Sequence, residues 1–194
     1  MTHKSGADAM EDSHMIDLIA AGDEQALAQF YLRYESRLFR FIKAKLPDAF
    51  EAADIVNEVF MEVWQKAARF EKRAKVSTWL FSIAYFKTVD RMRKTRPESL
   101  SDETLTTLED DSPASISCLI QAEESEQVHH CIGTLKPDHR AVMELTFFED
   151  MSYREIAQIV QCPENTVKTR MFHARQAMKK CLQRLLGGVN SHER

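Results

Sequence analysis

The stretch Ser152–Lys180, SYREIAQIVQCPENTVKTRMFHARQAMKK, decides what kind of fold and function this chain has. Ser152 and Glu155 form an S-x-x-E capping box, which predicts the start of a short helix. Pro163 forbids continuation of that helix, and Asn165 or the residue after it can cap a second one. The stretch therefore predicts a helix-turn-helix, a motif that places its second helix in the major groove of DNA.

The outer face of the second helix has the chemistry needed to read DNA. Its inner face is predicted to hold Val167, Met171, Ala174 and Met178, which recur at helical spacing. Arg and Lys donate hydrogen bonds to guanine O6 and N7, Thr and His reach base edges or phosphates, and Phe contacts a thymine methyl group. The candidate DNA-contacting residues are Lys168, Thr169, Arg170, Phe172, His173 and Arg175.

The composition favours an all-α protein. The chain of 194 residues allows one large domain or two small ones, and 44% hydrophobic residues suffice for a packed core. Only five Gly and five Pro interrupt long stretches of helical periodicity. No apolar run approaches the roughly 20 residues that span a bilayer, and no signal peptide is recognisable. We therefore expect a cytoplasmic protein without direct membrane insertion.

The charges are arranged in blocks along the chain, although the net charge is only −4. Basic residues predominate from Leu18 to Arg96, and the chain is mildly basic again from Lys136. The residues between Pro97 and Leu135 include many carboxylates and no Lys or Arg. Two basic blocks separated by an acidic one suggest two modules that face nucleic acid, joined by a spacer.

The predicted organisation is two small helical domains joined by a flexible acidic linker, with the helix-turn-helix in the second domain. Helical periodicity predicts helices at 17–46, with a break near Gly22-Asp23, and at 52–70, 77–94, 116–135 and 139–148, in addition to those of the helix-turn-helix. Within the third of these helices, Trp79 is predicted to be a core anchor. The predicted boundaries are a mobile tail at 1–15, a first domain at 16–96, the linker at 97–117, a second domain at 118–186 and a tail at 187–194.

The four cysteines are scattered and lack C-x-x-C spacing, so free thiols in a reducing cytoplasm are expected. A metal sensor built on Cys118, His129, His130 and Cys131 is a weak alternative, because adjacent helical residues point in different directions. No phosphate loop, nucleophile elbow or carboxylate pair suggests an enzyme. We therefore expect no catalytic residue, metal or cofactor.

The region from Asp23 to Leu182 resembles a bacterial sigma factor of the extracytoplasmic-function (ECF) type, a small two-domain group of the sigma-70 family. The stretch Ser152–Lys180 resembles the family's region 4.2, and LKPDHRAVMELTFFEDM resembles its region 4.1. Its region 2.2 resembles DIVNEVFMEVWQKAARF, and its regions 2.3 and 2.4 resemble STWLFSIAYFKTVDRMRK. The motifs occur in the family's order, with an acidic linker between the halves.

The resemblance assigns the first domain to polymerase binding and to the promoter −10 element. Region 2.2 of the family binds core RNA polymerase, and the matching residues are Asp54, Asn57 and Glu58. Regions 2.3 and 2.4 open and read the −10 element, which requires cations for phosphates and aromatic rings for unstacked bases. The matching residues are Lys72, Arg73, Lys75, Tyr85, Phe86, Lys87, Arg91 and Arg93.

The resemblance assigns the second domain to the −35 element, which the family reads as duplex DNA through the outer-face residues named above. Many members have Arg where His173 stands, and a neutral His cannot make the bidentate contact to guanine that Arg makes. A Gly is common in the turn where Asn165 stands, and Asn tolerates left-handed backbone geometry. The −35 preference therefore cannot be copied from the family.

The resemblance implies three partners: core RNA polymerase, promoter DNA and an anti-sigma factor of membrane-bound or soluble zinc type. In the family the acidic linker threads through the polymerase toward the RNA exit path, and a plain solubilising linker is the alternative. An ordinary helix-turn-helix regulator that acts without core polymerase is the main alternative function. A pure interaction protein is disfavoured by the basic, aromatic surface of the first domain.

Overall fold

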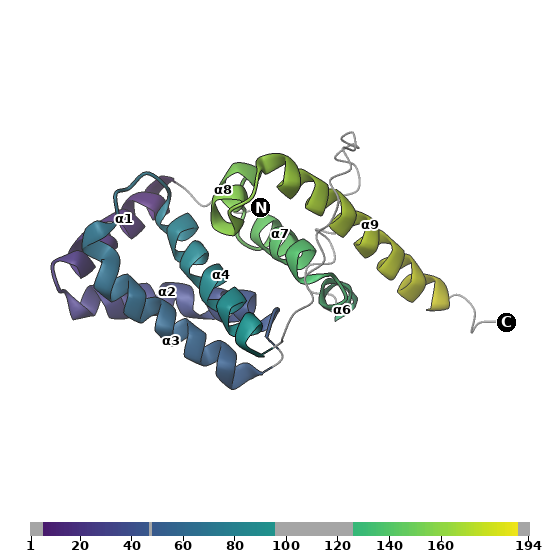
Figure 1. The fold of residues 1–194 in the computed structure, drawn as a ribbon, viewed down its shortest axis with the longest axis horizontal. Coiled ribbons are helices and arrows are strands. Elements are labelled where there is room, and N and C mark those ends of the chain that lie inside the picture. Colours follow the sequence, from purple (N-terminus) through teal and green to yellow (C-terminus); the bar gives the residue numbers. More distant parts are fainter. Residues whose placement is uncertain (1–5, 47, 96–125, 190–194) are drawn as a thin grey trace. The chain divides into compact units, whose positions relative to one another are not determined.

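The structure is a computed structural model, and it describes residues 6–46, 48–95 and 126–189. The described residues form helices and no strand, which confirms the all-α prediction. They separate into two compact units, an N-terminal unit built from α1–α4 and a C-terminal unit built from α6–α9 (Figure 1). The predicted linker at 97–117 lies outside the described residues.

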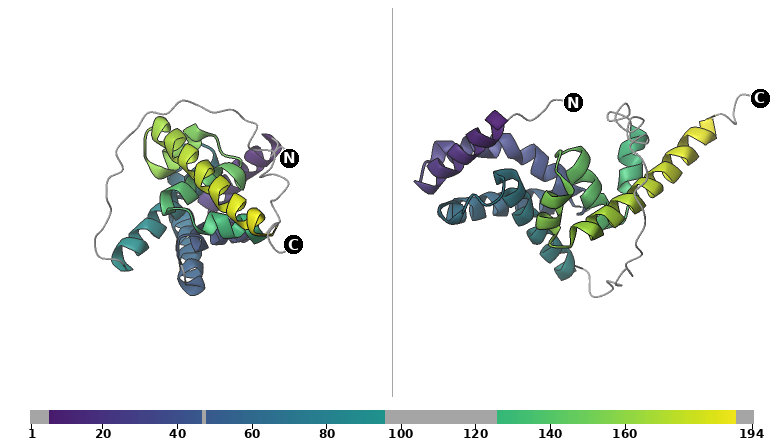
Figure 2. Two further views of the ribbon diagram at one scale, coloured as in Figure 1. Left: turned by 90° about the vertical axis from the view of Figure 1, so that its right-hand side faces the viewer. Right: turned by 90° about the horizontal axis from the view of Figure 1, so that it is seen from above.

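The N-terminal unit is a packed cluster of α1 (Gly6–Ala20), α2 (Glu24–Lys43), α3 (Ala49–Lys66), the short 3-10 helix η1 (Ala67–Arg69) and α4 (Val76–Thr95). α3 packs against both α2 and α4, as the views in Figures 1 and 2 agree. Two N-caps start these helices: the Asp23 carboxylate accepts hydrogen bonds at the start of α2, and Asp48 does so for α3. The core side chains include Phe30, Leu38, Ile55, Val59, Leu80 and Phe81, all fully buried.

The prediction of a mobile tail at 1–15 is wrong from residue 6 onward, because α1 begins at Gly6. Asp12 is 8% exposed and accepts hydrogen bonds from the Tyr34 hydroxyl and, at 2.8 Å, from Arg33 Nη1. Arg33 also donates to Glu11 at 2.6 Å. Residues 6–15 show no apolar periodicity that would predict a helix. Polar contacts with α2 help to hold this helix in place, and such contacts cannot be recognised from composition.

Replacing Tyr34 with Phe should change how the free energy of unfolding depends on pH. Burial first, and then the hydrogen bond to Asp12, raises the pKa of the Tyr34 hydroxyl above its ordinary value of 10.0. A group whose pKa is raised by folding stabilises the fold fully below its unfolded pKa, and this contribution is lost as the pH rises above that value. Between about pH 8 and about pH 11, wild type should therefore lose more stability than Tyr34→Phe in urea denaturation. Equal losses in the two proteins would contradict this.

The C-terminal unit consists of α6 (Glu126–Gly133), α7 (Pro137–Phe147), α8 (Tyr153–Val160) and α9 (Glu164–Val189). Pro137 occupies the first turn of α7, where its missing N–H has no cost. Arg140 of α7 donates to the carbonyl oxygens of Ile132, at 3.0 Å, and of Gly133, which satisfies acceptors at the end of α6. α9 continues to Val189, so the prediction of a tail is wrong for 187–189, and the rest of that predicted tail lies outside the described residues.

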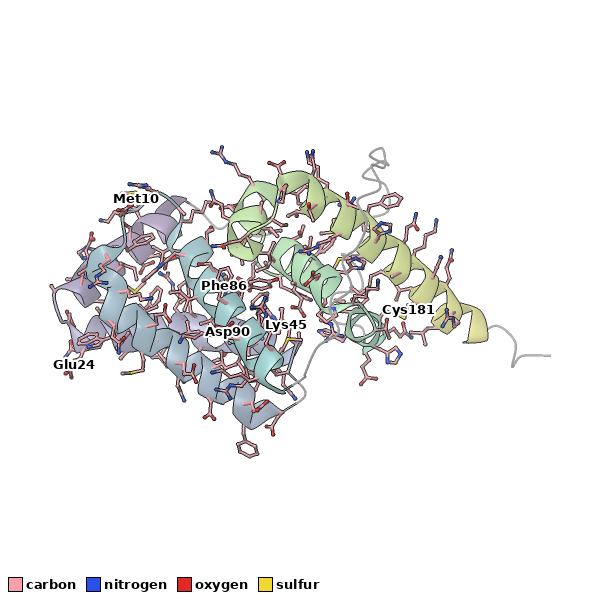
Figure 3. The ribbon with its side chains drawn as sticks, viewed as in Figure 1. Met10, Glu24, Lys45, Phe86, Asp90 and Cys181 are labelled. Carbon is pink, nitrogen blue, oxygen red and sulfur yellow. A yellow bond between two sulfur atoms is a disulfide. The ribbon has the colours of Figure 1, made fainter. Side chains whose placement is uncertain are left out.

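The prediction of free thiols is wrong for two of the cysteines. Cys131 of α6 and Cys181 of α9 (labelled in Figure 3) form a disulfide across 50 residues of sequence. Cys131 is fully buried, and Cys162 is the one free thiol among the described residues. Spacing could not reveal this bond, because it joins two helices that only the tertiary fold brings together. Cys118 lies outside the described residues.

Candidate nucleic-acid interface

The helix-turn-helix begins with the predicted capping box. The Ser152 backbone N–H donates to Glu155 Oε2 at 2.9 Å, and the Glu155 N–H donates back to Ser152 Oγ at 3.3 Å. Gln161 in the turn has a φ of +49°, a left-handed conformation. The Pro163 carbonyl then accepts from Val167 N–H at 3.2 Å as α9 starts. The left-handed residue of the turn is therefore Gln161. The sequence suggested Asn165 for this position, but Asn165 lies inside α9.

The inner face of α9 is as predicted: Val167, Met171, Ala174 and Met178 are each at most 1% exposed. Of the residues predicted to contact −35 DNA, Lys168 is exposed and the others are partly buried. Lys168 forms an ion pair with Glu164 at 3.3 Å, one turn earlier on the same helix. Such an exposed pair contributes little stability, so breaking it costs little free energy.

Three of the predicted DNA-contacting residues also contact other helices of the C-terminal unit. Arg170 forms an ion pair with Asp138 of α7 at 2.6 Å. The His173 ring stacks on His139 of α7, with 5.9 Å between centroids. Arg175 donates from Nη2 to the Tyr153 hydroxyl of α8 at 3.1 Å. These contacts hold the side chains in defined positions beside the exposed part of α9.

Two further predicted −35 residues lie beside this group. Thr169 is partly buried and donates from its hydroxyl to the Asn165 carbonyl at 3.0 Å, within α9. Phe172 is also partly buried and contacts the His173 ring edge to face, with centroids 5.6 Å apart. The hydroxyl of Thr169 is thus engaged by its own helix, which is common for Thr in helices.

The residues matched to polymerase binding lie together on the exposed face of α3. Asp54, Asn57 and Glu58 are exposed and line a shallow hollow of about 550 Å³, together with Met61, Glu62, Gln65, Lys66 and Lys87. The Tyr31 hydroxyl of α2 donates to Asn57 Oδ1 at 3.5 Å, at the edge of this surface. Met61 is 57% exposed, so the hollow offers apolar surface between carboxylates.

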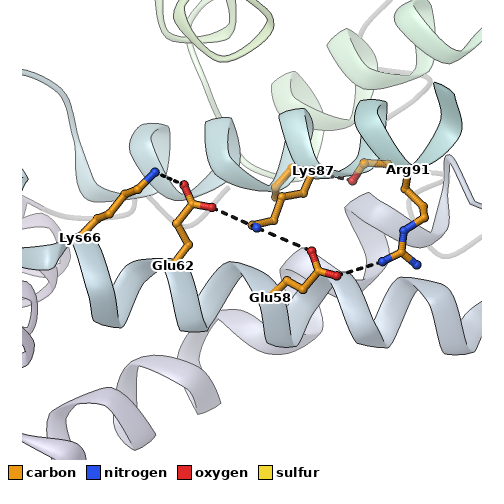
Figure 4. Close-up of polar contacts among 7 residues, drawn as sticks. Glu58, Glu62, Lys66, Lys87 and Arg91 are labelled. Carbon is orange, nitrogen blue, oxygen red and sulfur yellow. Dashed lines mark hydrogen bonds and ion pairs between the residues drawn. The ribbon is translucent and has the colours of Figure 1, made fainter. Parts of the chain in front are cut away.

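An ion-pair network joins α3 to α4 beside this hollow (Figure 4). Lys87 Nζ lies 3.0 Å from Glu62 Oε2 and 3.6 Å from Glu58 Oε2. Arg91 donates to Glu58 Oε1 at 2.9 Å, and Lys66 donates to Glu62 Oε1 at 2.7 Å. Burial acts to raise the pKa of Glu62, but the hydrogen bonds and the positive charges of Lys66 and Lys87 together outweigh it, and the pKa is lowered. Two cations predicted for −10 DNA therefore face the carboxylates of α3.

The loop before α4 holds other cations predicted for −10 DNA. Lys72 has a φ of +56° and forms an ion pair with Asp17 of α1 at 2.7 Å. Arg73 forms an ion pair with Glu71 at 2.8 Å, and Lys75 is exposed. The first of these pairs connects the loop to Asp17 of α1, where the sequence predicted a helix to begin, eleven residues after its actual start at Gly6.

Aromatic rings of the N-terminal unit lie at the surface near these cations. Trp79 stacks on Phe70 with centroids 4.8 Å apart and is only partly buried, so the prediction that Trp79 is a core anchor is wrong. Its neighbours Leu80 and Phe81 fill the core instead. Tyr85 and Phe86 of α4 contact each other edge to face, and Phe86 is 37% exposed. Phe86 and Asp90 are labelled in Figure 3. Arg93, another cation predicted for −10 DNA, is exposed near the end of the same helix.

Within residues 6–46, 48–95 and 126–189, no cluster of three or more His, Cys, Asp or Glu side chains is arranged to hold a metal ion. Of the residues considered for a metal sensor, His129 stacks on Phe148 and Cys131 is in the disulfide. No described helix combines the length and apolar character needed to cross a membrane.

Comparison with known proteins matches both units to one family. Residues 30–98 match the model for sigma-70 region 2, and residues 125–178 match that for sigma-70 region 4. The RNA polymerase sigma-H factor of Pseudomonas aeruginosa is 31% identical over 186 residues, which cover 91% of this chain and 96% of that protein. The ECF RNA polymerase sigma factor SigW of Bacillus subtilis is 29% identical over 179 residues, which cover 88% of this chain and 96% of that protein.

Solved structures have the same fold. CnrH, in its complex with the cytosolic domain of CnrY, has a TM-score of 0.63 and 22% identity, with 89% of this chain and 97% of that chain covered. The sigma factor RpoE of Bartonella quintana, in complex with the anti-sigma factor NepR, has a TM-score of 0.60 and 21% identity, with 80% and 96% covered. With both halves matched in order by family models and a relative aligned along nearly its whole length, the chain belongs to the sigma-70 family of RNA polymerase sigma factors, in its ECF group.

Proposed function

We propose that this sigma factor binds core RNA polymerase through the exposed face of α3, using Asp54, Asn57 and Glu58. The observation that carries the proposal is the hollow that these three polar residues line together with the exposed Met61. Interfaces of this kind combine an apolar contact with charge complementarity. The expected partner surface is a basic one with an apolar side chain that packs on Met61.

We further propose that α4 and the loop before it bind the −10 element. Phe70, Trp79, Tyr85 and Phe86 provide rings on which unstacked bases can lie, and the cations of the loop can contact phosphates. The −35 element is read by α9, where Lys168 contacts phosphate and Arg175 contacts a base edge. Catalysis is left to the polymerase, and the expected location of the complex is the cytoplasm.

Reconstitution tests this function. Purified full-length protein is added to bacterial core polymerase, and promoter-specific transcripts from a genomic DNA library are sequenced. The proposal expects core binding and transcripts that start at a shared two-part motif. A helix-turn-helix regulator that acts without core polymerase would bind duplex DNA alone and would neither bind core polymerase nor stimulate transcription.

Replacing Arg175 with Ala should weaken binding to a −35 duplex by roughly tenfold, the loss expected when a directed contact to a base edge is removed. The Tyr153 hydroxyl accepts a hydrogen bond that orients the Arg175 guanidinium. Tyr153→Phe should therefore weaken duplex binding by a smaller factor than Arg175→Ala does. Fluorescence anisotropy at one fixed salt concentration measures both, with a duplex selected from a random pool by the wild type. Lys179→Ala is the matched control, because it removes one exposed charge from the same helix. Equal losses in Arg175→Ala and Lys179→Ala would mean that Arg175 contributes charge alone.

An inhibitor is also proposed. RpoE of Bartonella quintana was solved with an anti-sigma factor, and CnrH with the cytosolic domain of CnrY. We expect this chain to be held inactive by an anti-sigma factor, of membrane-bound or soluble zinc type, that covers the surfaces used for polymerase or promoter. Co-purification of the chain with a second protein that blocks core binding in the reconstituted assay would identify it.

A further inference from the structure

Lys87 lies where two proposed surfaces of the N-terminal unit meet. It belongs to α4, which is proposed to bind the −10 element, yet its ammonium group lies within 3.6 Å of carboxylates on α3. It also lines the hollow that Asp54, Asn57 and Glu58 share. Its side chain is 24% exposed, so its contacts are partly shielded from water.

We propose that Lys87 is a shared residue that couples polymerase binding to −10 DNA binding. In the free protein Glu58 and Glu62 hold the ammonium group, and when core polymerase takes up these carboxylates, Lys87 is released to the promoter strand. The inference rests on the function proposed above, because it requires that α3 binds polymerase and α4 binds DNA.

The charges of the network make such an exchange possible. One ammonium group cannot give its full attraction to two carboxylates and a phosphate at once, so each new partner weakens the others. A basic polymerase surface that approaches Glu58 and Glu62 competes directly with Lys87 for the same oxygens. Lys66 holds the second oxygen of Glu62 at 2.7 Å, which keeps that carboxylate aligned while Lys87 leaves.

The coupling must be reciprocal. If core polymerase raises the affinity for −10 DNA by freeing Lys87, then bound −10 DNA raises the affinity for core polymerase by the same factor. Partly exposed ion pairs are weak, so the factor contributed by Lys87 should be about threefold.

The test measures binding of a short fluorescent single-stranded DNA of random sequence to the full chain, with and without core polymerase. Glu62→Gln removes one carboxylate from Lys87 and leaves Asp54, Asn57 and Glu58 in place. It should raise the DNA affinity of the free protein about threefold, since it mimics the loss of one ion pair. Glu24→Gln, an exposed residue at the start of α2 (labelled in Figure 3), makes the same change in net charge and should have no comparable effect.

A double-mutant cycle with Lys87→Ala identifies the residue responsible. The gain from Glu62→Gln should vanish in the double variant. Because Glu62 is itself one of the carboxylates proposed to face core polymerase, the comparison with polymerase uses a concentration that saturates both proteins, at which Glu62→Gln and wild type should bind DNA equally well. Three outcomes would overturn the proposal: no gain from Glu62→Gln, a gain that persists without Lys87, or an equal gain from Glu24→Gln. A wild type that fails to bind core polymerase would instead refute the proposed function.

Discussion

Reducing the Cys131–Cys181 disulfide should lower the free energy of unfolding of the C-terminal unit by about 4 kcal/mol, the loop-closure value for two cysteines with a sequence separation of 50. The bond connects α6 to α9, and α6 has only eight residues. A helix of this length is not stable alone. Once the bond is cut, α6 is held by noncovalent contacts such as those of the buried Val128 and Ile132.

Urea denaturation followed by far-ultraviolet circular dichroism, with and without dithiothreitol, measures this loss. Cys131→Ser with Cys181→Ser should reproduce the reduced state without reductant, and Cys162→Ser is the control that leaves the bond intact. Both tryptophans of the chain, Trp64 and Trp79, lie in the N-terminal unit, so the transition seen by their fluorescence should not move. If all four cysteines react with a thiol reagent in the native, unreduced protein, the disulfide is absent in solution.

Features encoded in local periodicity could be predicted from the sequence. The helix predicted at 52–70 corresponds to α3 at Ala49–Lys66, because its apolar side chains recur at helical spacing on one buried face. The inner face of α9 was predicted residue by residue for the same reason, and the capping box marked the start of α8. In each case the information lies within a few turns of one helix.

Features that depend on contacts between helices could not be predicted. The buried Asp12 of α1 forms hydrogen bonds with residues of α2. Cys131 of α6 forms a disulfide with Cys181 of α9. Lys87 was assigned to DNA because its charge is visible in the sequence, whereas its position against Glu62 is not. Trp79 fits the helical spacing of a core residue, but Leu80 and Phe81 occupy the core, so Trp79 stacks on Phe70 at the surface.

Replacing Glu58 with Lys should weaken binding to core polymerase at least roughly tenfold, equivalent to about 1.4 kcal/mol, because like charges across an interface repel. Two effects combine at this position. The new cation would face the basic surface expected of the polymerase, and it would lie beside Lys87 and Arg91, which now form ion pairs with Glu58 at 3.6 and 2.9 Å. Their repulsion would push apart the side chains that shape the hollow next to Asp54 and Asn57.

Binding to immobilised core polymerase separates this effect from misfolding. Glu58 has its side chain 48% exposed, so the variant should remain folded and should keep wild-type affinity for a −35 duplex, which the C-terminal unit is proposed to bind. Glu58→Gln should lose less affinity, since it removes attraction without adding repulsion, and Glu24→Lys reverses a charge outside the hollow and should bind normally. If Glu58→Lys binds core polymerase as well as wild type does, the proposed polymerase-binding surface on α3 is wrong, because Glu58 is next to Asn57 in the chain and one helical turn from Asp54.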